Sequence, residues 1–486
     1  MIAGLVVVAV SLLVPGCTKT DRQKERDGLD YETRMQRKYV NTFAWNVLES
    51  YYLWKDEIAK ALEKWENWEE PIQKVKEVRY KNAAGKDIDR WTQLTDDFAA
   101  FQGGVSGHTR TFGMDFVLYY ADQSQKKICA VVTYTYGNSP AEQAGLRRGD
   151  IILTVDGKEM TSSNYQEIVR DRLLGGDAVK LGLRDGKTVS MTAVDMYENP
   201  IQTVRILENE AGKKVAYLHY TSFTLDSCDE LSDVFRRFVK EGIDELVLDL
   251  RYNGGGYVIT EEVLASMLAP AAVVEAESIL SQMVYNKELA KELKEEPSRF
   301  QTGFTFRKNG VLQIVTTANA NPNLPRLFVL TTGSSASASE SLVCCLRPYM
   351  DVILIGGRTS GKYCAGFLME AKDWYDEVKE SLGAEEYDIA LPYVDNWGIY
   401  VMYARYADCN GDTISMPDGI APNYEVDDDP LDGFALGDPH ETMLAAALRI
   451  IDGRTRAAET PARSRLEPVG EYFHPRPGGI LIGQFN

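Results

Sequence analysis

The chain has 486 residues, which at about 150 residues per domain predicts two to four domains. Hydrophobic residues make up 44% and charged residues 26%, which excludes a wholly disordered chain. The net charge of −19 disfavours nucleic acid and anionic membrane surfaces as partners. Seven cysteines are too few for a disulfide scaffold, and four histidines limit multi-histidine metal sites, so we expect no metal and no cofactor.

The first seventeen residues have the pattern of an export signal. The apolar run over 2–14 is shorter than the roughly 20 residues of a membrane span, and it is typical of a secretory signal peptide. It ends in Val-Pro-Gly-Cys, which resembles the lipobox of bacterial lipoproteins, with Cys17 as the lipidated residue. An uncleaved anchor with an incidental cysteine is the alternative. We expect a signal peptide over 1–17, a polar tether over 18–30, and a body lipid-anchored in the bacterial cell envelope, periplasmic or on the outer-membrane surface.

The next segment, 31–110, is predicted to form an N-terminal helical region. Apolar and aromatic residues recur at helical spacing, as at Tyr39, Phe43, Val47 and Tyr51. This aromatic density indicates a helix that packs against another part of the protein.

Residues 111–198 change to short, alternating strands with turn signals between them. The stretch SPAEQAGLRRGDIILTVDGKEM follows a strand and contains a short helix and a further strand with an Asp-Gly turn. This order resembles a PDZ domain, a module that binds peptides by adding a strand to a sheet edge. Another small β-rich module is the alternative interpretation.

The resemblance implies peptide binding at the loop Phe-Gly-Met-Asp-Phe, through Gly113, Met114 and Phe116. Asp115 stands where PDZ domains usually have a second small residue. Because a carboxylate there would repel the carboxylate of a ligand, a preference for free C-termini is not expected from this loop.

From 199 to 452 the pattern alternates between strands and helices. The strands ELVLDL, RLFVLTT and DVILIGG are continuous apolar runs, of the kind that is buried on both faces of a parallel sheet. We therefore expect an α/β core. The charged stretch 281–311 is predicted to be an irregular insertion, and 453–486 a C-terminal tail.

Three short motifs in this core carry possible chemistry. DLRYNGGGY (249–257) has consecutive glycines that could expose backbone N–H groups to an oxyanion, or could simply form a tight turn. TTGSSASASESL (331–342) places serines at a predicted helix start, where Ser337 and Glu340 also read as an ordinary capping box. GGRTSGKYCAG (356–366) is nearly a phosphate-binding loop, but a tyrosine follows its lysine where that motif needs Ser or Thr.

A nucleophilic serine needs a base, and no histidine lies in a convincing catalytic context. His108 is in a glycine-rich loop and His219 is in a predicted strand, so both are interpreted as structural. A lysine can replace histidine if burial lowers its pKa, and Lys362 follows a buried strand.

The motifs LDLRYNGGG, GSSASASE, GRTSGK and MPDGIAPNYEV, together with the PDZ-like segment, resemble the carboxyl-terminal processing (tail-specific) serine peptidases. The sequence style is similar to lipoprotein members of Bacteroidetes-type bacteria. The resemblance implies a Clp-protease/crotonase-like α/β core with an inserted PDZ domain. It implies Ser337 as nucleophile, Lys362 as base 25 positions later, and the amides of Ala338 and Gly255 as oxyanion donors. It also implies an exported serine endopeptidase that cleaves proteins or peptides near their C-terminal ends through an acyl-enzyme.

One position departs from the family pattern. Many members carry Gln or Glu four residues after the lysine, where it orients the lysine, whereas this chain has Gly366. Glu340 is not assigned as its replacement. Two alternatives therefore stay open: a weakened or inactive peptide-binding protein of the same fold, and an unrelated exported protein that binds polysaccharide or another envelope component. The oligomeric state is not predicted.

Overall fold

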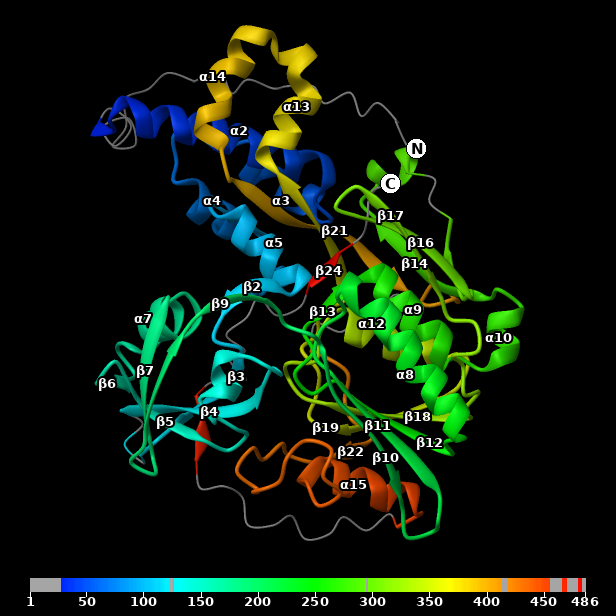
Figure 1. The fold of residues 1–486 in the computed structure, drawn as a ribbon. Coiled ribbons are helices and arrows are strands. Elements are labelled where there is room, and N and C mark those ends of the chain that lie inside the picture. Colours follow the sequence, from blue (N-terminus) through cyan, green and yellow to red (C-terminus); the bar gives the residue numbers. More distant parts are fainter. Residues whose placement is uncertain are drawn as a thin grey trace.

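The computed structural model describes residues 28–122, 124, 126–293, 296–412, 418–454, 466–469 and 480–482. Within these ranges the chain forms an N-terminal lobe, a PDZ-like lobe and a larger α/β lobe, which Figure 1 shows at the top, lower left and lower right. The predicted signal peptide and the lipidation residue Cys17 lie outside the described residues.

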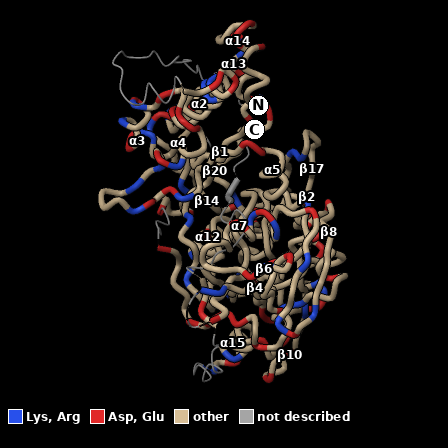
Figure 2. Tube along the Cα trace, turned by 90° about the vertical axis from the view of Figure 1, so that its left-hand side faces the viewer, with Lys and Arg blue, Asp and Glu red and all other residues tan. Residues whose placement is uncertain are grey.

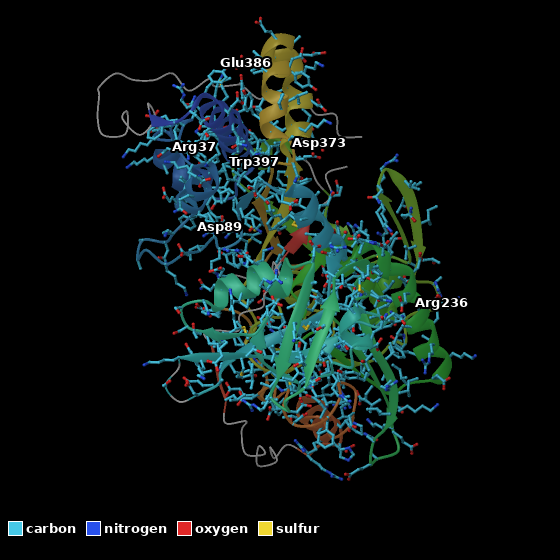
Figure 3. All side chains as sticks on the ribbon, turned by 60° about the vertical axis from the view of Figure 1, so that its left-hand side comes forward. Arg37, Asp89, Arg236, Asp373, Glu386 and Trp397 are labelled. Atoms are coloured by element: carbon cyan, nitrogen blue, oxygen red, sulfur yellow. The ribbon has the colours of Figure 1, made fainter. Side chains whose placement is uncertain are left out.

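The N-terminal lobe is helical, as predicted from its aromatic spacing. Its elements are α2 (Tyr31–Tyr51), α3 (Lys55–Leu62), α4 (Pro71–Val78), β1 (Gln93–Thr95) and α5 (Phe98–Ser106). The side chain of Asp30 caps the first helix by accepting the amide of Thr33. The buried face of α2 packs against α13 (Ala371–Leu382) and α14 (Ala384–Val394), which come from the second half of the chain. Figure 3 labels Glu386 of α14, which pairs with Lys38 of α2.

The PDZ-like lobe has its own apolar core. A two-stranded ribbon of β2 (His108–Thr111) and β9 (Val194–Tyr197) leads into and out of it. The remaining elements are β3 (Met114–Tyr120), β4 (Lys127–Thr135), α6 (Pro140–Gln143), β5 (Ile151–Val155), β6 (Lys158–Thr161), α7 (Tyr165–Ile168), the π-helical turn η1 (Val169–Leu174), β7 (Ala178–Leu183) and β8 (Thr188–Thr192). The strand order is β23-β3-β4-β6-β5-β7-β8, in which β23 (Glu467–Pro468) comes from the C-terminal part of the chain.

The α/β lobe contains a six-stranded sheet in the order β10-β11-β12-β18-β19-β22. The strands are β10 (Ile201–Glu208), β11 (Lys214–Tyr220), β12 (Glu245–Asp249), β18 (Arg326–Thr331), β19 (Asp351–Gly356) and β22 (Tyr424–Glu425), parallel from β11 onward. Helices α8 (Cys228–Glu241), α9 (Val258–Leu268) and α12 (Ala338–Leu346) cover one face, and α15 (Thr442–Ile451) covers the other. Burial on both faces explains the continuous apolar strands.

A second sheet joins the α/β lobe to the N-terminal lobe. It has the order β13-β24-β20-β21-β14-β15, and β1 pairs with β21. The strands are β13 (Gly255–Tyr257), β24 (Ile480–Ile482), β20 (Cys364–Glu370), β21 (Gly398–Ala407), β14 (Ile279–Tyr285) and β15 (Ser298–Arg299). The smaller elements nearby are η2 (Leu225–Ser227), α10 (Ala271–Glu275), α11 (Leu289–Glu292), β16 (Gly303–Lys308) and β17 (Val311–Thr316). The stretch predicted to be irregular therefore contributes β14 to a sheet and forms the β16–β17 hairpin.

The segment predicted to be a tail also contributes strands. Glu467–Pro468 forms β23 on the PDZ-like sheet, and Ile480–Ile482 forms β24 in the second sheet. Both appear as separate red arrows in Figure 1, far apart in space.

A buried ion network fixes the PDZ-like lobe on the α/β lobe. Arg148, from the PDZ-like lobe, lies 2.8 Å from Asp428 and donates to the hydroxyl of Tyr252. Asp428 also pairs at 2.9 Å with Arg251, which lies in the motif after β12 and reaches Glu441 as well. Both arginines hold the pKa of the Asp428 carboxyl down to about 2. Because a buried charge is costly when it loses its partner, this network ties the position of the lobe to the segment that follows β12.

The surface charge is mixed. In the view of Figure 2, lysine and arginine positions are interspersed with aspartate and glutamate positions. None of the helices in the described ranges is both long and apolar enough to cross a membrane. The six cysteines among the described residues are all free thiols.

Candidate functional site

Ser337 sits on a strained turn between a strand and a helix. It follows β18 and is the residue before the first residue of α12, with φ 60° and ψ −113°. A positive φ is costly for a residue with a side chain, and such strain clusters at functional sites. This geometry is the one by which strand-to-helix turns present a nucleophile. The hydroxyl points into the interior, because Ser337 is fully buried.

Ala338, the next residue, is the first residue of α12. The amides of the first helical turn have no acceptor within the helix, and they lie at the positive end of the helix dipole. The structure therefore places the predicted oxyanion donor Ala338 directly beside Ser337.

Lys362 is brought to Ser337 from the loop between β19 and β20. Its Nζ lies 3.4 Å from the Oγ of Ser337, and the side chain is 0% exposed. Burial lowers the pKa of Lys362 to about 7, and the nearby Cys364, Asp89 and Glu340 oppose that effect only in part. The two residues that the sequence predicts as nucleophile and base are thus within contact of each other.

Tyr400 is the second polar partner of the lysine. Its Oη accepts a hydrogen bond from Nζ of Lys362 at 2.9 Å, and its ring lies 5.1 Å from the same nitrogen. Tyr400 comes from β21, which pairs with β20, the strand that follows the lysine. The lysine therefore has an orienting partner, although Gly366 lacks a side chain that could serve as one.

Glu340 connects the serine turn to the lysine loop. Its Oε2 accepts the backbone amides of Ser337 at 3.0 Å and of Lys362 at 2.9 Å, and its Oε1 accepts the amide of Gly361 at 2.8 Å. The hydroxyl of Thr359 donates to it as well. Burial raises the pKa of the Glu340 carboxyl to about 7 in spite of these bonds. Glu340 therefore holds the two backbone segments together rather than contacting the lysine amine.

The glycine-rich segment after β12 lies against the serine turn. The backbone oxygen of Asn253 accepts the amide of Ala336 and the hydroxyl of Ser339, both at 3.0 Å. The amide of Gly255 donates to Oδ1 of Asn253 at 2.8 Å. Because that N–H is already bonded, the structure does not support Gly255 as the second oxyanion donor.

The loop predicted to bind peptides in the PDZ-like lobe has its donors engaged. The amide of Gly113 donates to the hydroxyl of Thr111 at 2.9 Å, and the amide of Phe116 donates to Oδ1 of Asp115 at 2.7 Å. The side chain of Phe116 lies in the core of the lobe, so the structure does not place it as a peptide contact. Met114 begins β3 and lines a cavity. The Asp115 carboxylate is thus bonded to a loop amide, in keeping with the expectation that this loop does not favour free C-termini.

A cavity of about 270 Å³ connects this loop with the α/β lobe. Its PDZ side includes Phe112, Met114 and Leu173, and its other side is the glycine segment 254–256. The cavity therefore lies between the PDZ-like lobe and the glycine segment after β12, and neither Ser337 nor Lys362 lines it.

The histidines His108 and His219 take no part in this site. His219 is buried and stacks edge-on against Tyr134 and Tyr252, and burial lowers its pKa to about 4. His108 lies beside Asp226 at the surface, 2.6 Å away. Across the described residues, no group of three or more His, Cys, Asp and Glu side chains is arranged to hold a metal ion.

Tyr400 could not be predicted from the sequence, because it lies 38 positions beyond Lys362 and outside every motif. Asp89 is a second such residue: its carboxylate accepts the hydroxyl of Tyr52 at 2.7 Å and the amides of Trp91 and Thr92. Figure 3 labels Asp89 on the N-terminal lobe, so this lobe contributes to the electrostatic surroundings of the lysine.

Two family descriptions match the chain. Residues 214–426 match peptidase family S41, and residues 131–172 match the PDZ domain. These ranges fall within the two regions that the sequence predicted as catalytic core and PDZ domain.

Curated relatives carry serine protease names. The "Probable CtpA-like serine protease" of Staphylococcus aureus (strain COL) is 28% identical over 285 residues, which are 58% of this chain and 50% of that protein. The "Carboxyl-terminal-processing protease" of Picosynechococcus sp. is 25% identical over 317 residues, which are 64% of each chain. The chain thus spans about half the length of the Staphylococcus relatives that it matches.

The fold has a counterpart among solved structures. The crystal structure of a candidate S41 protease from Bacteroides fragilis NCTC 9343 superposes with a TM-score of 0.62 at 24% identity, covering 85% of this chain and 97% of that one. Together with the matches in sequence, this likeness confirms the predicted fold class of an α/β peptidase core preceded by a PDZ domain. Over residues 214–426 the chain is thus similar to serine peptidases of family S41, and over residues 131–172 to PDZ domains.

Proposed function

We propose that the protein is a serine endopeptidase in which Ser337 is the nucleophile and Lys362 is the general base. The observation that carries this proposal is a fully buried lysine amine 3.4 Å from a serine hydroxyl at the start of a helix. The low pKa of about 7 leaves a substantial fraction of this amine neutral near pH 7, which a base requires. The serine protease names of the relatives support the same reaction class.

In the first half of the reaction the lone pair of Nζ takes the proton of the Ser337 hydroxyl while Oγ bonds to the scissile carbonyl carbon. The N–H groups of the neutral amine remain available to Tyr400, whose Oη accepts one of them at 2.9 Å. This bond turns the lone pair toward the serine. Apo distances such as 3.4 Å shorten when substrate is bound.

The negative charge that forms on the carbonyl oxygen is stabilised by the amide of Ala338 at the positive end of α12. When the carbon–nitrogen bond breaks, the ammonium of Lys362 returns its proton to the leaving amine. The acyl group then remains on Ser337 as an ester. Lys362 next takes a proton from water, whose oxygen attacks the ester carbon. As the bond between that carbon and Oγ breaks, the ammonium of Lys362 gives the proton to Oγ, which restores the Ser337 hydroxyl and releases the new C-terminus.

The substrates we propose are proteins or peptides cleaved near their C-terminal ends. The carboxyl-terminal processing name of one relative and the presence of a PDZ domain support this class. The bonded amides of Gly113 and Phe116 argue that the PDZ domain recognises the extended backbone of a peptide rather than its terminal carboxylate.

An inactive protein of the same fold was the alternative suggested by Gly366. The bond from Lys362 to Tyr400 removes the reason for that alternative, because the lysine has an orienting partner. An unrelated binding protein finds no support in the family matches.

The test is cleavage of a peptide library by the wild type and by Ser337→Ala and Lys362→Ala, read by mass spectrometry. We expect losses of at least a thousandfold in both variants, and an acyl-enzyme that forms on Ser337 alone. Ser334→Ala is the matched control, since this nearby serine is buried and its hydroxyl bonds to none of the described residues. Equal cleavage by wild type and Ser337→Ala would refute the proposal.

We further propose that the protein is exported and lipidated at Cys17, so that it is anchored in the bacterial cell envelope. The apolar run and the Val-Pro-Gly-Cys sequence support this proposal. Expression in a bacterium with a radiolabelled fatty acid tests it. We expect label on the wild type and none on Cys17→Ser, and label on both would contradict lipidation at this residue.

A further inference from the structure

The chain places part of its own C-terminal segment on the open edge of the PDZ sheet. Glu467 and Pro468 of β23 pair antiparallel with Tyr120 and Tyr119 of β3. The amide of Val469 continues the ladder by donating to the oxygen of Leu118 at 3.0 Å. The side chain of Val469 is 8% exposed and packs into the core of the PDZ-like lobe.

The direction of this added strand matches the use of the edge for peptides. Because β23 runs antiparallel to β3, the chain proceeds from Tyr120 toward Leu118, and hence toward the end of β3 at Met114 and the loop before it. PDZ domains bind peptides by adding a strand to a sheet edge. Residues 467–469 therefore occupy an edge of the kind that a peptide ligand would need.

The same segment reappears beside the serine and the lysine. The backbone of β24 pairs in parallel with β13 on one side, where Ile480 is opposite Gly255, and with β20 on the other, where Ile482 is opposite Gly366. Strand β13 contains glycines of the segment after Asn253, and strand β20 begins two residues after Lys362. Figure 1 shows β24 between the labels of β13 and β21, in the centre of the molecule.

In the sheet order, β24 is the strand that joins β13 to β20. Main-chain groups of both strands face the position that β24 fills, so any extended peptide in that position would be hydrogen-bonded on two sides. The position also adjoins the glycine segment 254–256 that lines the cavity leading from the PDZ-like lobe. It is therefore suited to a peptide chain that also contacts the PDZ edge.

We propose that residues 466–469 and 480–482 act as an intramolecular peptide ligand, with β23 on the PDZ edge and β24 in the strand position beside Ser337 and Lys362, and that substrates bind by displacing them. The proposal rests on the proposed peptidase function and specifies its substrate class. Residues 480–482 read Ile-Leu-Ile. Substrates are accordingly extended segments with a short apolar run. They bind through backbone pairing with the edge strand β3 of the PDZ-like sheet and with strands β13 and β20.

Tethering explains how such short strands compete with substrate. A ligand joined to its own site by a short linker has an effective concentration in the millimolar range. β23 has two residues and β24 has three, so each adds few hydrogen bonds and each is displaceable. The apparent affinity for a free peptide is lowered in proportion to the fraction of molecules in which the segment is bound.

The experiment measures binding to the full-length protein without cleavage. A fluorescent peptide with the sequence of residues 466–482 is titrated, by anisotropy, into Ser337→Ala and into the same protein carrying Leu481→Pro or Val469→Asp. Proline removes the amide of residue 481 and aspartate opposes burial of residue 469. We expect the peptide to bind at least tenfold more tightly to each variant with a weakened segment.

The matched control is Ile314→Asp, in the β16–β17 hairpin, where the side chain is 75% exposed. Ser337→Ala that also carries Ile314→Asp should bind the peptide as weakly as Ser337→Ala alone. Hydrogen exchange adds an independent readout. The backbone amide of residue 469 should exchange at least tenfold more slowly in the wild type than in Leu481→Pro or Val469→Asp. Equal peptide affinity in all variants, or exchange of Val469 at the same rate in all of them, would overturn the proposal.

Cleavage separates this proposal from the proposed function. With Ser337 intact, the same segment variants should cleave a peptide containing Ile-Leu-Ile with a kcat/KM at least threefold above wild type. Tighter binding without cleavage in any variant would refute the peptidase function and leave the docking of the segment standing. Unchanged binding with normal cleavage would refute the docking alone.

Discussion

Gly366 makes room for Tyr400. A Cβ atom at position 366 would lie 2.6 Å from Cζ of Tyr400 and 2.4 Å from the terminal methyl of Met402, closer than any packed contact allows. The absence of a side chain lets the tyrosine ring reach the lysine, with Oη 2.9 Å from Nζ. The polar partner of Lys362 thus comes from the neighbouring strand β21 and not from position 366.

Tyr400→Phe removes the acceptor of the lysine N–H and keeps the ring. We expect kcat to fall about tenfold with KM nearly unchanged, since the tyrosine acts on the position of the base and not on substrate binding. Loss of the acceptor also disfavours the ammonium, so the midpoint of the pH profile should move to lower pH. Steady-state kinetics from pH 5 to 9 measures both effects. Tyr403→Phe is the control, because that residue faces Phe367 and Tyr285, and a midpoint equal to wild type in Tyr400→Phe would contradict the assigned role.

Gly366→Ala tests whether the missing side chain at position 366 is what leaves room for the ring of Tyr400. The added methyl must displace Tyr400 or Met402, and overpacking of this kind costs about 1–3 kcal/mol. Combining Gly366→Ala with Tyr400→Ala should cost less than the sum of the single changes, by at least about 1 kcal/mol, because the ring is no longer in the way. Urea unfolding of the four proteins measures this coupling. Additive costs would show that the two positions are independent.

The candidate site residues that lie within sequence motifs could be predicted from the sequence. The motifs around Ser337 and Lys362 resemble those of the tail-specific peptidases, and that resemblance implied the pair whose Nζ and Oγ lie 3.4 Å apart in the structure. Tyr400 was not predictable in this way, because its contact depends on the register between β20 and β21. Register is set by tertiary packing, which a single sequence does not display.

The strands β14, β23 and β24 were also not predicted from the sequence. The stretch 281–311 was predicted to be irregular because it is charged and has no regular pattern, but pairing with β21 makes Ile279–Tyr285 the strand β14. β23 and β24 have only two and three residues, too few for any periodic pattern. In all three cases the strand exists because a neighbouring edge accepts it.

Glu340→Gln should disrupt the serine turn and the lysine loop together. A glutamine keeps one oxygen and presents an NH₂ group to backbone amides that are themselves donors. Leaving buried donors unpaired costs about 1–3 kcal/mol each, so we expect unfolding free energy to fall by about 2–4 kcal/mol and kcat by at least a hundredfold. Thermal unfolding and kinetics give the two values.

The control for this change is Glu261→Gln. Glu261 is likewise buried, on α9, its Oε1 has no hydrogen-bond partner among the described residues, and glutamine is nearly isosteric with glutamate. A stability loss in Glu340→Gln no larger than that in Glu261→Gln would show that the carboxylate does not brace the site.

The activity of the wild type should rise with pH through about 7. Only the neutral amine of Lys362 accepts the serine proton, and its pKa of about 7 predicts roughly one tenth of the plateau rate at pH 6 and a plateau by pH 9. The measurement is kcat/KM on one peptide substrate in buffers of constant ionic strength. A rate that is flat from pH 6 to 9 would exclude the lysine as base.

Lys362→Met should be more stable than the wild type, and the difference should depend on pH. The pKa of the lysine is about 7 in the folded protein and 10.5 in the unfolded chain, so between these values only the unfolded state holds the proton. The wild type therefore loses stability as pH falls from 10.5 to 7, by about 1.4 kcal/mol per pH unit, and no further below 7. Methionine removes this cost.

Urea unfolding at pH 7, 8 and 9 tests the prediction. The advantage of Lys362→Met over wild type should shrink by about 2–3 kcal/mol between pH 7 and pH 9, since each pH unit is worth about 1.4 kcal/mol. Lys287→Met is the control, because its side chain is 87% exposed and pays no burial cost. A difference between Lys362→Met and wild type that stays constant over this range would mean that the lysine is not held neutral by burial, and the proposed base would lose its physical foundation.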